Sequence, residues 1–351
     1  MHVLVTGGAG FIGSHLVEYH LGRGDKVHVV DALTTGRVEN IRAFLGDPGF
    51  RFDEADILTW GDLDKAAAWA DRVYHMAAEV GVYRVLAEPI RVLATNIAGT
   101  ERLLRAVTAG KWRPQVLLAS SSEVYGPSPE SELREESALT IHSGAPSRWN
   151  YAVSKLADEA LGMSYARHLD LPVTIVRFFN TTGPRQTGRY GMVVPRFIRQ
   201  AVAGEPLTIY GDGTQTRSFC DVRDTVAALD LLAGNPASAG EIVNVGNDRE
   251  ITIRGLAELI RERAGSRSPL QFLSYQEAYG EEFEDINHRC PVLDKLYGLT
   301  GFRHGWTLEK TLDDLIRRRR EPLKEPTHGD PAVLRSQSEH HRQYSGSASR
   351  S

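Results

Sequence analysis

Residues 1–13 of the chain read MHVLVTGGAGFIG, and the expected fold follows from them. The apolar run His2–Thr6 is typical of a buried strand, and the apolar spacing of Ile12–Leu21 is typical of a helix. Between them lies TGGAGFIG, a glycine-rich loop that leaves the strand and opens the helix. At such a turn the free N–H groups and the dipole of the helix N-terminus favour a phosphate. The stretch therefore predicts a dinucleotide-binding strand, loop and helix.

The glycines of this loop have separate predicted roles. Gly7 and Gly8 allow the tight turn. Gly10 lets the backbone approach a pyrophosphate, and Gly13 permits close packing of helix and strand.

Asp31 ends the next apolar run, roughly 20 residues after the glycines. A carboxylate at this place accepts hydrogen bonds from the adenosine ribose and repels a 2′-phosphate, which favours NAD over NADP. Arg37 is close enough in sequence to soften that preference. Asp56 and Ile57 follow the third apolar run and are expected to flank the adenine.

The alternation of strands and helices continues through the first half of the chain. The predicted strands are Lys26–Val30, Arg51–Asp56, Arg72–Met76, Gln115–Ala119 and Val173–Phe178, and the predicted helices are Arg84–Thr108 and Tyr151–His168. This order indicates βαβ units and a parallel sheet covered on both faces. We therefore expect an α/β protein with an NAD-binding Rossmann doubly wound parallel sheet and a smaller α/β substrate lobe.

Three regions are predicted along the chain. Residues 1–178 form the Rossmann domain and 179–320 the smaller lobe, whose turn-rich sequence carries short helices at Met192–Val202 and Thr252–Arg263. Arg217–Leu232 has a helical apolar pattern, and part of 217–246 is expected to return to the first domain. Residues 321–351 are polar and rich in Pro, Ser and Gly, which predicts a disordered tail.

Composition excludes several classes of protein. The 351 residues are 41% hydrophobic and carry a net charge of −4, so no basic field indicates nucleic acid or a membrane surface. No apolar stretch is long enough for a transmembrane helix, and the start MHVLVTG lacks the features of a secretory signal. Cys220 and Cys290 form no disulfide framework, and no zinc-binding spacing is present. A cytoplasmic enzyme without a metal is expected.

Two further motifs indicate catalysis. Tyr151 and Lys155 share a helix face, where an ammonium can lower the pKa of a phenol and let it act as a base. The strand ending at Ala119 leads into SSSEVYG (120–126), at the carboxyl edge where doubly wound sheets place their sites. A serine hydroxyl there is the expected partner of the tyrosine on a substrate alcohol.

An ordered set of motifs then resembles the extended short-chain dehydrogenase/reductases that modify nucleotide sugars. The set is TGGAGFIG, Asp31, HMAA (75–78), TNIAGT (95–100), SSSEVYG, YAVSK, RFFNTTGPRQ (177–186), GEPLTIYGDGTQTRSF (204–219) and NHRCP (287–291). The resemblance implies bound NAD, a nucleoside-diphosphate sugar as substrate, with UDP as the expected nucleotide, and a homodimer formed through two helices that match Arg84–Thr108 and Tyr151–His168.

The resemblance also implies roles for individual residues. Tyr151 matches the family's base, Lys155 its partner and Ser121 the catalytic Ser/Thr. The implied cofactor-binding residues are Gly7, Gly10, Phe11, Ile12, Gly13, Asp31, Asp56, Ile57, Ala77, Asn96, Tyr151 and Lys155. The implied substrate-binding residues are Ser121, Ser122, Asn180, Arg185, Arg217 and Arg289.

Glu123 bears on which reaction follows the shared oxidation of the sugar at C4. UDP-glucuronate decarboxylases carry a carboxylate at this position, and they resemble this chain in SEVYG, FNTTGPR and the Arg289 motif. We therefore expect decarboxylation of UDP-glucuronate to UDP-xylose, with Glu123 catalytic.

The motifs leave other reactions open. RWNYAVSKLADE (148–159) looks like the sequence of a UDP-sugar 4-epimerase, and Glu123 also suits the base of a 4,6-dehydratase. A non-catalytic NAD-sensing protein is the alternative from another class. The intact set of Ser121, Tyr151 and Lys155 argues against it.

Overall fold

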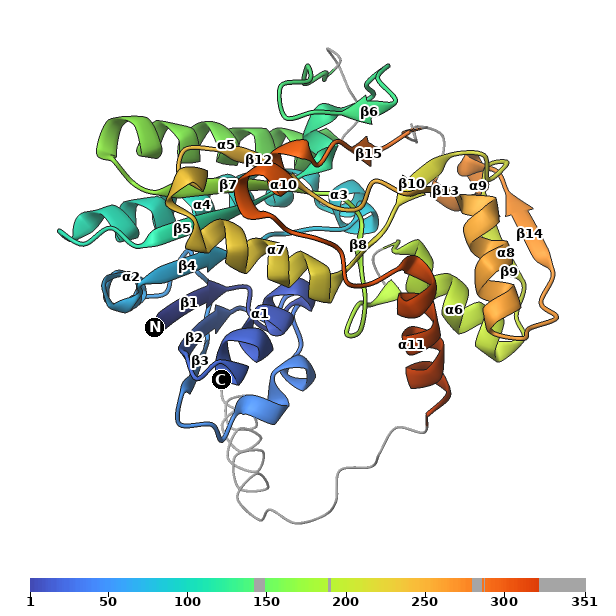
Figure 1. Ribbon diagram of the computed structural model, residues 1–351, viewed down its shortest axis with the longest axis horizontal. Helices are drawn as coiled ribbons and strands as arrows, with labels where there is room; N and C mark the ends of the chain where they lie inside the picture. The colour runs from blue at the N-terminus through green and yellow to red at the C-terminus, as the bar shows by residue number, and fades with distance from the viewer. Residues whose placement is uncertain (142–148, 189–190, 280–285, 287, 322–351) are drawn as a thin grey trace, which may run out of the picture. The chain divides into compact units, whose positions relative to one another are not determined.

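A seven-stranded parallel sheet lies at the centre of the protein, in the order β12-β7-β5-β4-β1-β2-β3 (Figure 1). Its strands are β1 (His2–Thr6), β2 (Lys26–Asp31), β3 (Phe50–Glu54), β4 (Arg72–His75), β5 (Gln115–Ser121), β7 (Val173–Phe178) and β12 (Ile242–Val245). Every neighbouring pair is parallel. The chain runs from β1 out to β3 and returns to β4 on the other side of β1, so the order reverses there, where such sheets bind ligands. The doubly wound sheet is confirmed, and each predicted strand is present to within two residues at its ends.

The computed structural model describes residues 1–141, 149–188, 191–279, 286 and 288–321. Within these, residues 1–319 form one compact unit. The tail expected to be disordered, 321–351, lies outside the described residues except for Glu321. Among the described helices, none is long and apolar enough to cross a membrane.

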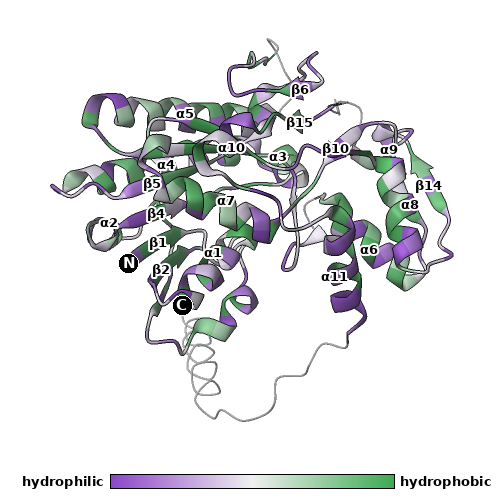
Figure 2. Cartoon of the chain, in the orientation of Figure 1, coloured by the Kyte–Doolittle hydropathy of each residue, from purple (hydrophilic) through white to green (hydrophobic). Residues whose placement is uncertain are grey.

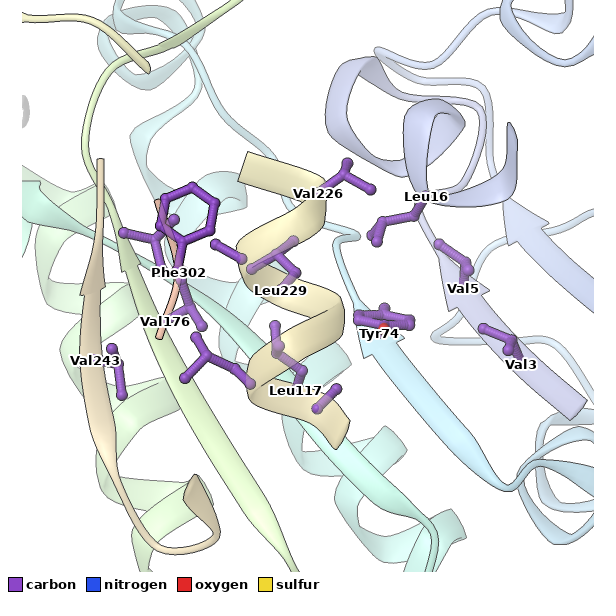
Figure 3. Close-up of a cluster of buried hydrophobic side chains, with 14 of the residues drawn as sticks. Val3, Val5, Leu16, Tyr74, Leu117, Val176, Val226, Leu229, Val243 and Phe302 are labelled. Atoms are coloured by element: carbon purple, nitrogen blue, oxygen red, sulfur yellow. The ribbon is translucent and has the colours of Figure 1, made fainter. Parts of the chain in front are cut away.

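Helices cover both faces of the sheet. One face holds α1 (Phe11–Gly22), α7 (Val222–Gly234) and α10 (Asp294–Thr300); the other holds α2 (Leu63–Trp69), α4 (Pro89–Ala109) and α5 (Asn150–Leu169). The two faces form because successive strand residues point in opposite directions. Val3 and Val5 pack in the same cluster as α1 and α7, whereas Leu4 between them packs with α2 and α4. Figure 3 shows the first cluster, with Val226 and Leu229 of α7 packed over the strands.

Two predicted helices are wrong in their bounds. Arg84–Thr108 is interrupted: α3 (Val82–Ala87) ends before Pro89, which opens α4, and the intervening Glu88 has a non-helical φ of −132°. Proline restricts the residue before it and cannot continue a helix. The first part of Arg217–Leu232 lies in the strands β10 (Thr216–Ser218) and β11 (Cys220–Asp221). Helix α7 starts only at Val222, where Asp221 caps it by accepting a hydrogen bond from the Arg223 N–H.

A second lobe has its own apolar cluster. It contains α6 (Val193–Ala203), α8 (Ile253–Arg263), α9 (Tyr275–Tyr279), α11 (Leu308–Arg320), β9 (Leu207–Tyr210), β13 (Glu250–Thr252) and β14 (Leu270–Leu273). Phe197, Leu256 and Leu312 join α6, α8 and α11 in this cluster. Figure 2 shows the end of α11 as strongly hydrophilic, in keeping with its sequence LEKTLDDLIRRRR.

Short elements connect these layers. They are the 3₁₀ helices η1 (Val38–Asn40), η2 (Arg42–Phe44), η3 (Ser122–Tyr125) and η6 (Pro236–Ser238) and the strands β6 (Glu132–Leu133), β8 (Thr181–Thr182) and β15 (Cys290–Pro291). β6 pairs with β15 and β8 with β11. Through the first pair, the segment that carries Arg289 lies beside the segment that follows SSSEVYG.

Candidate active site

The glycine loop after β1 has backbone geometry that other residues would disturb. Gly7 has a φ of +72°, and a Cβ there would lie 2.6 Å from the backbone nitrogen of Ala77. A Cβ on Gly13 would lie 2.2 Å from the Gly7 carbonyl oxygen, so helix α1 approaches the loop too closely for any side chain. At Gly8 the constraint is packing, because a Cβ there would lie 2.6 Å from a methyl carbon of Val29. The loop is thus packed tightly from behind, and its other side borders a hollow.

Asp31 is held at the end of β2 by backbone hydrogen bonds. Its Oδ2 accepts from the Ala9 N–H at 2.9 Å and its Oδ1 from the Leu33 N–H at 2.8 Å. Burial raises the pKa of Asp31, while these backbone donors act in the opposite direction. The hydrogen bonds therefore aim a carboxylate into the hollow at the place where an adenosine ribose is expected.

We call this space the loop-side hollow; it measures about 380 Å³, a size typical of small-molecule sites. Every residue predicted to bind the cofactor lines it, from the glycine loop through Asp31, Asp56, Ile57, Ala77 and Asn96 to Tyr151 and Lys155 on α5. Arg37 lines it as well. A tight glycine loop at one end and a fixed carboxylate beside it fit a dinucleotide with an unphosphorylated ribose.

A second space, the lobe-side hollow, adjoins the first and also measures about 380 Å³. Its lining includes Ser121, Glu123, Asn180, Arg217 and Arg289, together with residues of the second lobe. Ser121 and Tyr151 line both hollows. The predicted base and its serine partner therefore stand where a cofactor and a substrate would meet.

Two residues predicted to bind substrate are placed elsewhere. Ser122 is buried and lines neither hollow, because η3 turns it inward, and its Oγ has no hydrogen-bond partner among the described residues. Arg185 lines the loop-side hollow instead of the lobe-side one. Its Nη1 donates to Ser14 Oγ at 3.2 Å and its Nη2 pairs with Glu18, both on α1. The structure therefore does not bring these two residues into the lobe-side hollow with the other predicted substrate-binding residues.

The residues predicted to be catalytic lie on β5, α5 and the turn η3 that follows β5. Ser121 ends β5, and its Oγ accepts a hydrogen bond from the Glu123 N–H at 3.2 Å. Burial raises the pKa of Tyr151, and the charge of Glu123 adds to the rise; Lys155 and the Ser121 hydroxyl act against it. The ammonium therefore has the predicted influence, but the expected net fall in the tyrosine pKa does not occur because desolvation outweighs it.

A buried polar layer supports these residues from α5. Lys155 Nζ donates to Asp158 Oδ2 at 3.0 Å. Glu159, the next residue, accepts from Ser120 Oγ at 2.6 Å and from two nitrogens of Arg177 at 2.9 and 2.8 Å. The sequence prediction missed both carboxylates, although their spacing of three and four residues from Lys155 places them near its face of the helix.

Glu123 and Arg289 meet in the lobe-side hollow. Arg289 Nη1 donates to Glu123 Oε1 at 2.5 Å, and its Nη2 donates to Asn180 Oδ1 at 2.8 Å. Asn180 in turn donates to the Ser218 carbonyl at 3.0 Å. Arg217 donates to the carbonyls of Thr216 and Ile286, both at 2.7 Å. The guanidinium of Arg289, the residue before β15, thus connects η3 and the segment after β7 to this strand.

The lobe-side hollow is also lined by residues that the sequence prediction missed. Arg196 lies over the ring of Tyr210, 4.0 Å from its centre, and Gln215 Nε2 donates to Tyr275 Oη at 3.0 Å. All four line the hollow. Two of them, Tyr210 and Gln215, lie inside the motif GEPLTIYGDGTQTRSF (204–219), so this motif could have indicated them as site residues. Within the described residues no group of His, Cys, Asp and Glu could hold a metal ion.

This fold and site define an NAD-dependent enzyme, and comparison with known proteins agrees. Residues 3–246 match the NAD dependent epimerase/dehydratase family. The chain belongs to this family, which confirms the resemblance found in the motifs.

Three relatives are informative. The chain is 37% identical over 321 residues to UDP-N-acetyl-alpha-D-glucosaminuronate decarboxylase of Bacillus cytotoxicus, covering 91% of this chain and 97% of that protein. It is 35% identical to UDP-glucuronic acid decarboxylase 4 of Arabidopsis thaliana, covering 90% and 68%. The structure of UDP-glucose 4-epimerase from Thermotoga maritima with UDP-glucose matches with a TM-score of 0.82 and 28% identity, covering 91% and 99%.

Proposed function

We propose that the protein decarboxylates a UDP-linked hexuronic acid, converting UDP-glucuronate to UDP-xylose through a 4-keto sugar. The observation that carries this proposal is the pairing of Glu123 and Arg289 in the lobe-side hollow, which Tyr151 also lines. A carboxylate and a guanidinium beside the base suit a sugar that carries its own carboxylate at C6. The identity to two decarboxylases over most of the chain supports the same reaction.

The first step takes place where the two hollows meet. When bound in the loop-side hollow, NAD supplies an acceptor for the hydride from sugar C4 and later returns it. Tyr151 takes the proton of the C4 hydroxyl, Ser121 orients that hydroxyl, and Lys155 stabilises the phenolate that acts as base. The ketone at C4 then stands two carbons from the carboxylate carbon.

Loss of CO2 follows from that relationship. The C5–C6 bond breaks, its electron pair moves towards the C4 oxygen as an enolate, and a proton then adds to C5. Arg289 binds the sugar carboxylate, for which a guanidinium provides two parallel donors. Glu123 places a like charge beside it, which raises the energy of the carboxylate before it leaves.

The decarboxylase of Bacillus cytotoxicus suggests a second substrate, UDP-N-acetylglucosaminuronate. The two sugars differ at C2, whereas the chemistry takes place at C4, C5 and C6. The same residues would therefore serve both. A UDP-sugar 4-epimerase is the second candidate function, favoured by the 28% identity and shared fold with the Thermotoga maritima enzyme.

The test is to incubate purified protein with NAD and, separately, UDP-glucuronate, UDP-N-acetylglucosaminuronate, UDP-glucose and dTDP-glucose, and to measure product masses. Loss of one CO2 from either uronate supports the proposal. An unchanged mass with a new chromatographic peak identifies an epimerase, and loss of one water identifies a dehydratase.

Glu123→Gln tests the residue directly. We expect CO2 release to fall by ~10²-fold or more while NAD stays bound, because the charge beside the carboxylate is removed. Glu136→Gln is the matched control, since Glu136 is exposed and lines neither hollow. Equal rates for the two variants would exclude Glu123 from the mechanism.

We also propose a homodimer that forms through α4 and α5 and a cytoplasmic location. Ile90 on α4 is 82% exposed, which is consistent with a helix face that a second copy covers. Sedimentation equilibrium with Ile90→Glu tests the dimer, and a variant that sediments like the wild type would argue against this face. Cell fractionation tests the location.

A further inference from the structure

Helix α5 places three ionisable side chains in succession along its buried face. Tyr151 is followed one turn later by Lys155, and Lys155 by Asp158. Both Lys155 and Asp158 are 2% exposed, and Asp158 Oδ2 accepts a hydrogen bond from Lys155 Nζ at 3.0 Å. The other oxygen, Oδ1, is buried with no hydrogen-bond partner among the described residues. An unsatisfied buried carboxylate oxygen is costly, so its presence next to a catalytic lysine requires an explanation.

A buried ammonium keeps its proton only with a counter-charge nearby. Burial on its own would lower the pKa of Lys155, whereas the adjacent Asp158 carboxylate raises it, and the net direction is upward. The neighbouring Glu159 cannot take this place, because both of its oxygens already bind Arg177. Asp158 is therefore the carboxylate that holds the lysine.

We propose that Asp158 is a positioning residue that keeps Lys155 protonated and fixed beside Tyr151. It acts through the lysine and touches neither hollow. This inference rests on the proposed function only in so far as Tyr151 serves as the base, a step that the decarboxylase, epimerase and dehydratase reactions share.

The other ionisable groups around this trio are accounted for. From β4, His75 faces Lys155, and burial together with the lysine charge lowers the pKa of His75 to about 3, so it is neutral. From η3, Glu123 is paired with Arg289, and from β7, Arg177 is paired with Glu159.

Helix α4 packs against the same face with uncharged groups. Its buried Asn96 and Thr100 are hydrogen-bonded to Ser154 and His75. Among the described residues around this trio, Asp158 is thus the carboxylate whose ion pair is with Lys155 alone.

The consequence is a specific pH dependence. A carboxylate stabilises the protonated form of any neighbouring group, so Asp158 raises the pKa of Lys155 and also that of Tyr151. Activity requires an ionised tyrosine and a charged lysine, which define the acid and alkaline limbs of the pH–kcat profile. Removing the carboxylate should therefore move both limbs to lower pH.

Asp158→Asn is the test, because asparagine has the same shape and no charge. We expect both limbs to shift to lower pH by roughly one unit. Asp64→Asn, which removes an exposed carboxylate from α2, is the matched control and should leave both limbs in place. If the acid and alkaline limbs of the pH–kcat profile of D158N coincide with those of the wild type, the proposal is overturned, whatever the melting temperature of the variant.

A second readout needs no turnover, so it separates this inference from the proposed function. Ultraviolet difference spectra against Tyr151→Phe isolate the phenolate of one of the 12 tyrosines. The D158N protein should ionise Tyr151 at lower pH than the wild type does, even if the assigned substrate is wrong. Should D158N fail to fold, Lys155→Met/Asp158→Asn should fold, because it removes the unpaired buried charge; failure of the double variant would also overturn the proposal.

Discussion

Glu159 ties together helix α5 and the strands β5 and β7. On α5, its carboxylate accepts hydrogen bonds from Ser120 on β5 and from Arg177 on β7, at 2.6 to 2.9 Å. The Arg177 and Glu159 side chains are 3% and 4% exposed. Replacing Glu159 with glutamine keeps the volume and removes the charge, so the guanidinium is left buried without its partner.

The burial decides the size of the effect. Breaking a buried ion pair by removing one partner costs about 3–5 kcal/mol, whereas an exposed pair contributes about 0–1 kcal/mol. Arg177 keeps a hydrogen bond to the Glu135 carbonyl at 3.0 Å and its position 4.8 Å from the Tyr125 ring centre, so part of its surroundings survives. We therefore expect Glu159→Gln to lower the free energy of unfolding by about 3 kcal/mol.

Urea unfolding followed by circular dichroism measures this difference. Glu258→Gln is the matched control, because Glu258 pairs with Arg254 at 3.0 Å with both side chains well exposed, and it should cost less than about 1 kcal/mol. Replacing both partners, Glu159→Gln with Arg177→Met, should recover part of the loss because no charge remains buried. A cost for E159Q no larger than that of E258Q would refute the reasoning.

Three other changes have defined outcomes. Gly13→Ala places a Cβ 2.2 Å from the Gly7 carbonyl oxygen and should weaken NAD binding, measured by calorimetry, at least ~10-fold. Gly22→Ala is the control, because its added Cβ meets no atom within 4 Å, and it should leave NAD binding unchanged. Equal NAD affinities for the two variants would contradict this account of the loop. Burial lowers the pKa of His15 to about 4, so between about pH 6.5 and pH 4 the unfolded chain binds a proton that the folded chain does not, and stability should fall as the pH drops through this range. His15→Gln should make the melting temperature less dependent on pH over the same range. A pH dependence equal to that of the wild type would exclude His15 as its cause. Tyr151→Phe should lower kcat by ~10²–10⁴-fold, and a rate within tenfold of the wild type would remove it as the base.

Much of the site could be predicted from sequence because its requirements are local. The turn at Gly7 needs a positive φ, and the close approach at Gly13 excludes a side chain; both constraints act within one loop and are visible as glycines. Asp31 was found from its place at a strand end, and the pair Tyr151 and Lys155 from the period of a helix. Such patterns depend on a few neighbouring residues, so they can be interpreted without knowing how the rest of the chain folds.

Other features depend on which distant segments meet. The ion pair between Glu123 and Arg289 joins residues 166 positions apart, and the reach of Arg185 to Ser14 spans 171, so no local pattern records either contact. The inward turn of Ser122 follows from how η3 packs after β5.

The direction of the Tyr151 pKa was likewise decided by tertiary structure. Sequence alone identified the lysine that lowers it but not the burial that outweighs the lysine. The amino-acid sequence determined the sheet, the cofactor loop and the placing of Tyr151 and Lys155 on one helix face, because backbone geometry and strand and helix periodicity are local. Only the tertiary structure decided which charged groups face one another and how far each is buried from solvent, because desolvation and pairing depend on every segment that packs around a group.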